Sequence, residues 1–74
     1  TQNQIYEQEL LKEQKLYWQG LLATNPTYLD GWIELANVQL KLGEKEEARL
    51  SLAQAKNINP NSLKTKNLEE SLKN

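Results

Sequence analysis

The sequence predicts an all-α fold of about four helices, arranged as antiparallel helix-turn-helix units of the kind that stack into an α-solenoid. Apolar residues recur at spacings of three and four along most of the 74 residues, which is the period of an amphipathic helix. Gly and Pro fall between these stretches, where helices end. Pro26 and Pro60 also lie 34 residues apart, and units of about that length bury their apolar faces only by stacking on neighbours.

The first helix is expected over residues 5–23. Thr1 and Gln4 have the spacing of a capping box. Gly20 weakens the last turns by about 1 kcal/mol relative to alanine, so apolar packing is expected to hold them. Pro26 ends the helix, because the residue before a proline is pushed out of the helical region. The wide apolar face of this helix contains Leu10, Leu11, Tyr17, Trp18, Leu21 and Leu22.

The second helix is expected over residues 28–42. Thr27 is positioned to cap free amides at its start, and Asp30 suits the positive end of the helix dipole. Gly43 is the expected terminator, because glycine accepts a left-handed conformation. Two apolar stripes run along this helix, so it requires packing partners on two sides. They comprise Leu29, Trp32, Ile33, Ala36 and Leu40 on one side, and Leu35, Val38 and Leu42 on the other.

The third helix is expected over residues 45–57. Its acidic residues Glu44, Glu46 and Glu47 suit a helix start. The tight turn before it predicts antiparallel packing on the second helix. Ala48 and Ala55, opposite Ala36, indicate that the two helices approach closely.

The fourth helix is expected over residues 62–73. Leu63, Leu68 and Leu72 give it only a thin apolar edge, and charged residues cover the remainder. This pattern suits a terminal helix with a polar outer face, which solenoids need for solubility.

Composition argues against several classes of function. The chain has no Cys and no His, so neither a disulfide, a conventional zinc site nor a thiolate nucleophile is expected. Its acidic residues do not have calcium-loop spacing. The net charge is −1, so we expect no basic surface that would bind nucleic acid. The mean hydropathy of −0.79 predicts no membrane-spanning segment. No cofactor or metal is therefore expected.

The cluster from Glu44 to Arg49 is interpreted as a solvated helix start. Paired carboxylates can perform acid–base chemistry, but here no histidine or glycine-rich turn accompanies them. We therefore expect no enzymatic activity. The chain begins at Thr1 and contains no Met, so it is expected to be a cleaved product or an excerpt, and cytoplasmic and extracellular locations both stay open.

Residues 29–62 resemble a tetratricopeptide repeat, whose pattern is Trp-x2-Leu-Gly-x2-Tyr, then Ala-x3-Phe, then Pro, over about 34 residues. In this chain the pattern is Trp32-x2-Leu35-Ala36-x2-Gln39, then Gly43, Ala48-x3-Leu52-x2-Ala55 and Pro60. Gln39 departs from the pattern, because a tyrosine that packs toward the following helix is usual there.

Carried backwards, the same register makes the first helix resemble the second half of a preceding repeat. Trp18 then occupies the aromatic position and Leu21 the small-residue position, while Gln14 replaces the close-contact alanine. We expect a single domain over residues 1–74, with a half repeat and extended first helix in 1–26, a full repeat in 27–62 and a capping helix in 63–74. Because arrays usually need at least three repeats, something outside the chain is expected to complete this one.

The resemblance implies a non-catalytic protein–protein interaction module with a peptide groove along the second helix. The candidate groove residues are Asp30, Ile33, Asn37, Leu40 and Lys41. Asn37 matches a position at which many relatives hold peptide backbone. Asp30 and Ile33 stand where a basic pair would grip a terminal carboxylate, so a clamp for chain ends is not expected.

The alternative is a self-assembling structural subunit, in which the open first helix of one copy packs on the last helix of the next. Such a head-to-tail contact gives rings if it closes and filaments if it does not. A third alternative is an accessory domain of a larger protein. Expected partners are thus other chains or peptides, a homo-oligomer or a larger assembly. The candidate self-association residues are Ile5, Tyr6, Leu10, Tyr17, Leu63, Leu68 and Leu72.

Overall fold

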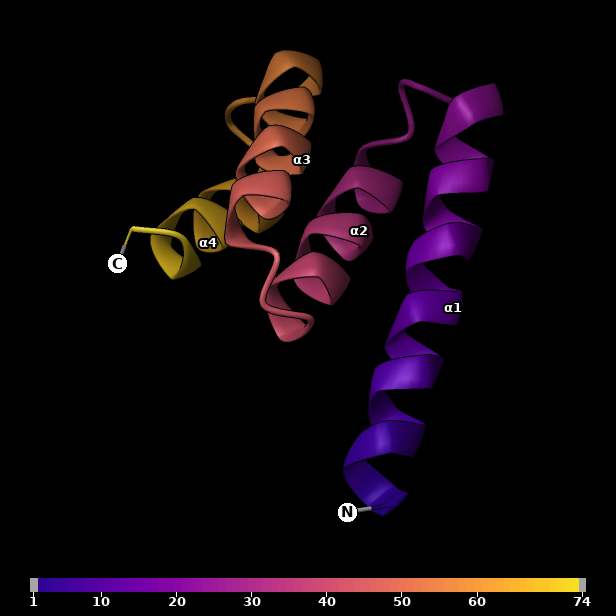
Figure 1. The fold of residues 1–74 in the computed structure, drawn as a ribbon. Coiled ribbons are helices and arrows are strands. Elements are labelled where there is room, and N and C mark those ends of the chain that lie inside the picture. The colour runs from indigo at the N-terminus through magenta and orange to yellow at the C-terminus, as the bar shows by residue number, and fades with distance from the viewer. Residues whose placement is uncertain (1, 74) are drawn as a thin grey trace.

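The fold consists of four α-helices, as predicted, with no strand in the part of the chain that the structure describes. A computed structural model describes residues 2–73, with side chains from residue 4 onward. The helices are α1 (Gln2–Thr24), α2 (Leu29–Lys41), α3 (Lys45–Ile58) and α4 (Leu63–Ser71). Figure 1 shows α1, α2 and α3 side by side with alternating directions, and α4 packs against both α2 and α3.

The central helix α2 is buried on two sides, which confirms the prediction of two apolar stripes. On the side of α3, Ala36, Ala48 and Ala55 are fully buried. On the side of α1, a Cβ atom built on Gly31 would lie 2.8 Å from Cδ2 of Leu22. Both interfaces therefore depend on small residues that let helix backbones approach closely.

The last helix completes the core instead of presenting its apolar edge to solvent. Leu68 and Leu72 are only 3% and 4% exposed, and both join the core cluster with Ile33 and Leu52. The two leucines are therefore not exposed for the self-association contact predicted for them, because α4 turns its thin apolar edge toward α2 and α3. Leu63 alone of the three leucines is exposed, at 73%.

The helix ends match the sequence only in part. Gly43 has a φ of 81°, the left-handed conformation expected of a glycine terminator. The predicted Thr27 cap is wrong, because Tyr28 precedes the first turn of α2 and no side chain caps it. The loop is held instead by Trp32, whose Nε1–H donates to the carbonyl of Pro26 over 2.8 Å. The predicted capping box rests on Thr1, which lies outside the described residues.

The first helix is 23 residues long, against 14 for α3. Glu9 lies 34 residues before Gly43, so α1 continues through the position at which the repeat turns. Figure 1 shows its N-terminal half running past the end of α2. Lys15 secures α1 to the α2–α3 turn through a 2.8 Å ion pair with Glu44.

Candidate protein-binding surfaces

The five predicted groove residues are divided among different surroundings. Ile33 and Asn37 line a hollow of about 290 Å³ between α2 and α4. Lys41 lines a second hollow, of about 320 Å³, between α2 and α1. Leu40 packs against the core cluster, and Asp30 accepts a 3.1 Å hydrogen bond from Lys64 of α4. Neither of these two hollows is lined by all five side chains, and their use as one peptide groove stays a prediction.

The hollow between α2 and α4 has a polar character. Lys64, Asn67 and Ser71 of α4 line it together with Asn37. Asn37 is half-buried, and its amide forms no hydrogen bond with another described residue. Contact of Asn37 with peptide backbone stays a prediction.

Exposed apolar side chains gather along α1. Tyr6, Leu10 and Tyr17 are 71%, 43% and 62% exposed, and Leu21 is half-buried. Their spacings of four, seven and four residues place them on one face of a helix. We call these four residues the α1 stripe. Leu10 also lines the hollow that contains Lys41, so the structure places a predicted groove residue beside a predicted patch residue.

Two exposed large apolar residues of α1, Ile5 and Leu16, lie away from the stripe. Because successive residues of a helix are rotated by about 100°, Ile5 projects from a different face than Tyr6. Leu16 projects from nearly the same face as Ile5 and is 66% exposed. The predicted patch of Ile5, Tyr6, Leu10 and Tyr17 is therefore not one continuous surface.

The repeat register shows what would cover the α1 stripe. Ser51 and Ala48 of α3 are covered by α2 and are 3% and 0% exposed. The residues 34 positions earlier are Tyr17, which is 62% exposed, and Gln14, which is also exposed. The face of α1 that corresponds to the α2-binding face of α3 therefore carries no helix in the described structure.

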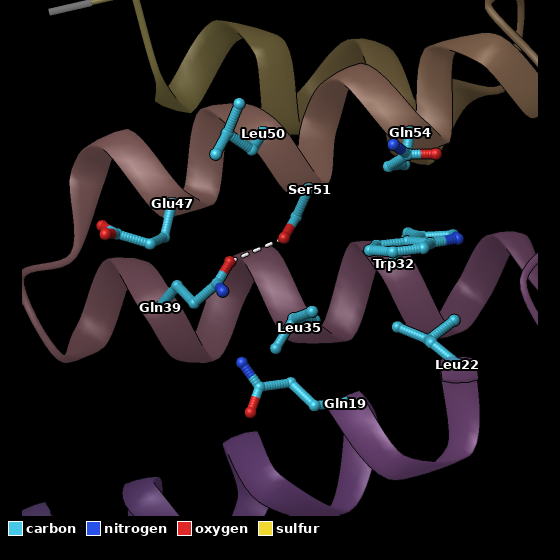
Figure 2. Close-up of a pocket in the computed structure, with 9 residues that line it drawn as sticks. All are labelled: Gln19, Leu22, Trp32, Leu35, Gln39, Glu47, Leu50, Ser51 and Gln54. Atoms are coloured by element: carbon cyan, nitrogen blue, oxygen red, sulfur yellow. Dashed lines mark hydrogen bonds between the residues drawn. The ribbon is translucent and has the colours of Figure 1, made fainter.

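A third surface lies between α1 and α3, with α2 as its floor. This open trough has a volume of about 360 Å³, and Figure 2 shows the residues that line it. Where the α3 wall meets the floor, the hydroxyl of Ser51 donates to Oε1 of Gln39 over 2.7 Å. Sequence reasoning singled out Gln39 but missed Ser51 as its partner, because nothing in the helical period relates a buried serine on α3 to it. The trough is lined by Gln19, Leu22, Trp32, Leu35, Gln39, Glu47, Leu50, Ser51 and Gln54.

Many of the charged groups form ion pairs at the surface. Lys56 hydrogen-bonds Glu69 over 2.7 Å, and this bond, with the charge of Lys56, lowers the pKa of Glu69 below its ordinary value of 4.5. Within residues 4–73, no three acidic side chains lie close enough to hold a metal ion. None of the described helices combines the length and apolarity needed to cross a bilayer.

The antiparallel pair α2–α3, the preceding helix α1 and the following helix α4 define a protein of the helical-hairpin repeat class. A family model described as tetratricopeptide repeat matches residues 8–72, so the chain belongs to the tetratricopeptide repeat family. Members of this family are generally protein–protein interaction modules without catalysis. No curated protein and no solved structure matches the chain significantly.

Proposed function

We propose that this chain is a non-catalytic protein-binding module that receives an amphipathic helix on the α1 stripe. The contrast between Tyr17 and Ser51, at equivalent positions of the repeat, carries the proposal. A helix that covered Tyr17 as α2 covers Ser51 would bury apolar surface now in water, at roughly 25 cal/mol per Å². Contiguous exposed apolar patches of this kind typically mark protein contacts.

The residues of α1 restrict the chemistry of this partner helix. Gln14 and Tyr17 are larger than Ala48 and Ser51, their equivalents on α3, so the partner needs small side chains opposite them. Glu7 and Glu13 flank the stripe on its two sides, and neither forms an ion pair with a described residue. The expected partner therefore has alanine or glycine along its contact line and lysine or arginine at its edges.

A defined probe tests this proposal. The probe is a peptide of residues 27–43 with the Gln39→Ala change, which supplies an α2-type helix with a small residue opposite Tyr17. In amide NMR spectra of the labelled chain, we expect the peptide to shift the signals of Leu10, Gln14, Tyr17 and Leu21. The variant Tyr17→Glu is expected to lose these shifts.

The matched control is Leu16→Glu, which introduces the same charge on a different exposed face of α1 and should leave binding intact. Equal binding by the two variants would show that the peptide does not use the stripe.

The second candidate function is self-assembly, and the stripe itself favours it because every copy carries the same patch. Two copies could cover each other through a two-fold contact of α1 with α1. The head-to-tail form is disfavoured because Leu68 and Leu72 are buried and the outer surface of α4 and the residues after it is charged, with Lys66, Glu70 and Lys73 exposed.

Sedimentation across a wide concentration range tests self-assembly. A dimer would give a mass that rises with concentration in the native chain and in Leu16→Glu, but not in Tyr17→Glu. A chain that stays monomeric at every concentration would contradict self-assembly, and the α1 stripe would then be expected to bind a helix of another protein.

A further inference from the structure

We propose that the trough between α1 and α3 binds a short extended segment of a partner protein, one with an apolar side chain close to a lysine or arginine. The nine lining residues of the trough provide an apolar end, a free hydrogen-bond donor and one unpaired negative charge. This site is separate from the α1 stripe, so either can bind when the other does not.

The trough lies on the opposite side of α2 from the hollow that contains Asn37. On α2, its floor consists of Trp32, Leu35 and Gln39, at spacings of three and four. Ile33 and Asn37, which line the hollow beside α4, are rotated by about 130° and about 170° from the mean direction of this line. A segment in the trough therefore contacts α1 and α3 without touching α4.

One end of the trough is apolar. Figure 2 shows Leu22 and Trp32 together at this end, with Leu35 next to them on the floor and the amide of Gln54 on the α3 wall above Trp32. Leu22 and Leu35 are 3% and 4% exposed, whereas Leu50 on the rim is 69% exposed. An apolar side chain placed here would cover the exposed part of Trp32, with a gain proportional to the apolar area removed from water.

The other end offers a hydrogen-bond donor. Gln39 is 4% exposed, and its Oε1 is occupied by Ser51. Its Nε2 donates to no acceptor among the described residues, and Figure 2 shows it turned away from Ser51. Thr65 Oγ1 is the one fully enclosed side-chain nitrogen or oxygen of residues 4–73 without a partner, so the nitrogen of Gln39, which lines the trough, is not fully enclosed. A buried donor gains most from an acceptor such as a peptide carbonyl.

The negative charge of the trough favours a basic side chain on the bound segment, next to its apolar one. Glu47 is the only charged residue among the nine. It is exposed and takes no part in the ion pairs found between described side chains, including the adjacent pair of Glu46 with Arg49. A lysine or arginine on the bound segment would satisfy this carboxylate.

The dimensions suit a segment of about three residues. Seven helical residues separate Glu47 from Gln54 along one wall, which at 1.5 Å per residue is about 10 Å. An extended chain covers that length with three residues at about 3.3 Å each.

The test compares two tripeptides, N-acetyl-Leu-Ala-Lys-amide and N-acetyl-Leu-Ala-Glu-amide, titrated into the labelled chain. The signals to follow are the indole N–H of Trp32 and the side-chain amide of Gln39, with the indole of Trp18 as an internal reference. We expect both trough signals to shift, and the lysine peptide to bind about two- to fivefold more tightly, the range that an exposed ion pair supplies.

Two charge-neutralising variants make the result specific. Glu47→Gln should abolish the preference for the lysine peptide, whereas Glu34→Gln, at an exposed position of α2 beside the other hollow, should retain it. Tyr17→Glu should also retain it, which separates this site from the α1 stripe. The proposal is overturned if the Trp32 and Gln39 signals do not move, or if the preference survives Glu47→Gln.

Discussion

The side chains of Gln39 and Ser51 join α2 to α3 through a buried hydrogen bond of 2.7 Å between the serine hydroxyl and Oε1 of the amide. Both residues are at least nine-tenths buried, at 4% and 3% exposure. In the repeat pattern that residues 29–62 resemble, a tyrosine would pack toward α3 from this position of α2. Here a shorter polar pair occupies that place, which leaves the trough open above it.

Ser51→Ala is expected to destabilise the fold by about 1–3 kcal/mol, because it leaves the buried oxygen of Gln39 without a donor. The double variant Gln39→Leu with Ser51→Ala removes both partners and should recover most of this loss. Urea unfolding followed by circular dichroism measures both values. Additive effects of the two changes would contradict a direct bond.

The glycines should respond in opposite directions to alanine. A Cβ atom on Gly20 would have no atom within 4 Å, so Gly20→Ala should stabilise α1 by about 0.5–1 kcal/mol. Gly43 has a φ of 81°, so Gly43→Ala should cost about 1–2 kcal/mol. Thermal melts of the two variants check the signs, and a loss of stability in Gly20→Ala would argue against the position of α1.

Shortening of a buried leucine side chain tests whether the fourth helix packs in the core. Leu72→Ala removes a buried side chain and should cost about 2–5 kcal/mol, enough to unfold much of a chain this small. Leu63→Ala, at an exposed position of the same helix, should change stability by less than about 0.5 kcal/mol. Similar effects of the two changes in urea unfolding would mean that α4 does not dock through Leu72.

The ion pair of Glu69 with Lys56 predicts a weak dependence of stability on acid. Because the hydrogen bond and charge of Lys56 lower the pKa of Glu69 from 4.5, the folded state holds the carboxylate more readily than the unfolded chain does. Its contribution is fully present above the unfolded pKa and is lost as the pH falls through the lowered folded pKa. Carboxyl NMR titration should show the pKa of Glu69 rising toward its ordinary value in Lys56→Met, but not in Lys66→Met.

The sequence predicted the helices because their signals are local. The two stripes of α2 required two neighbours, and α1 and α3 are those neighbours. The 34-residue spacing of the prolines and the left-handed Gly43 defined the hairpin. The Thr27 cap failed because Trp32 bonds the carbonyl of Pro26 instead, a contact that capping patterns do not include.

The surfaces were harder to predict because they depend on how helices turn about their axes. Leu68 and Leu72, four residues apart, form an apolar edge that suits either a core or an interface, and only the docking of α4 decides between them. The trough is lined by residues of three helices, so predicting it requires the relative positions of all three. Ser51, twelve residues from Gln39, donates to the amide oxygen and leaves the amide nitrogen of Gln39 without an acceptor among the described residues. The period of a single helix does not predict this contact between two helices.

The central claim is that a partner helix packs on the α1 stripe. A thermal melt of a lengthened chain tests it most directly. Residues 1–9 are replaced by a second copy of residues 27–43 that carries Gln39→Ala, so that an α2-type helix precedes α1 in the register of the repeat. The account predicts that Tm rises above that of the native chain, by about 4–8 °C for each kcal/mol gained, and that Tyr17→Glu removes the rise. A Tm that is unchanged or lower would contradict it.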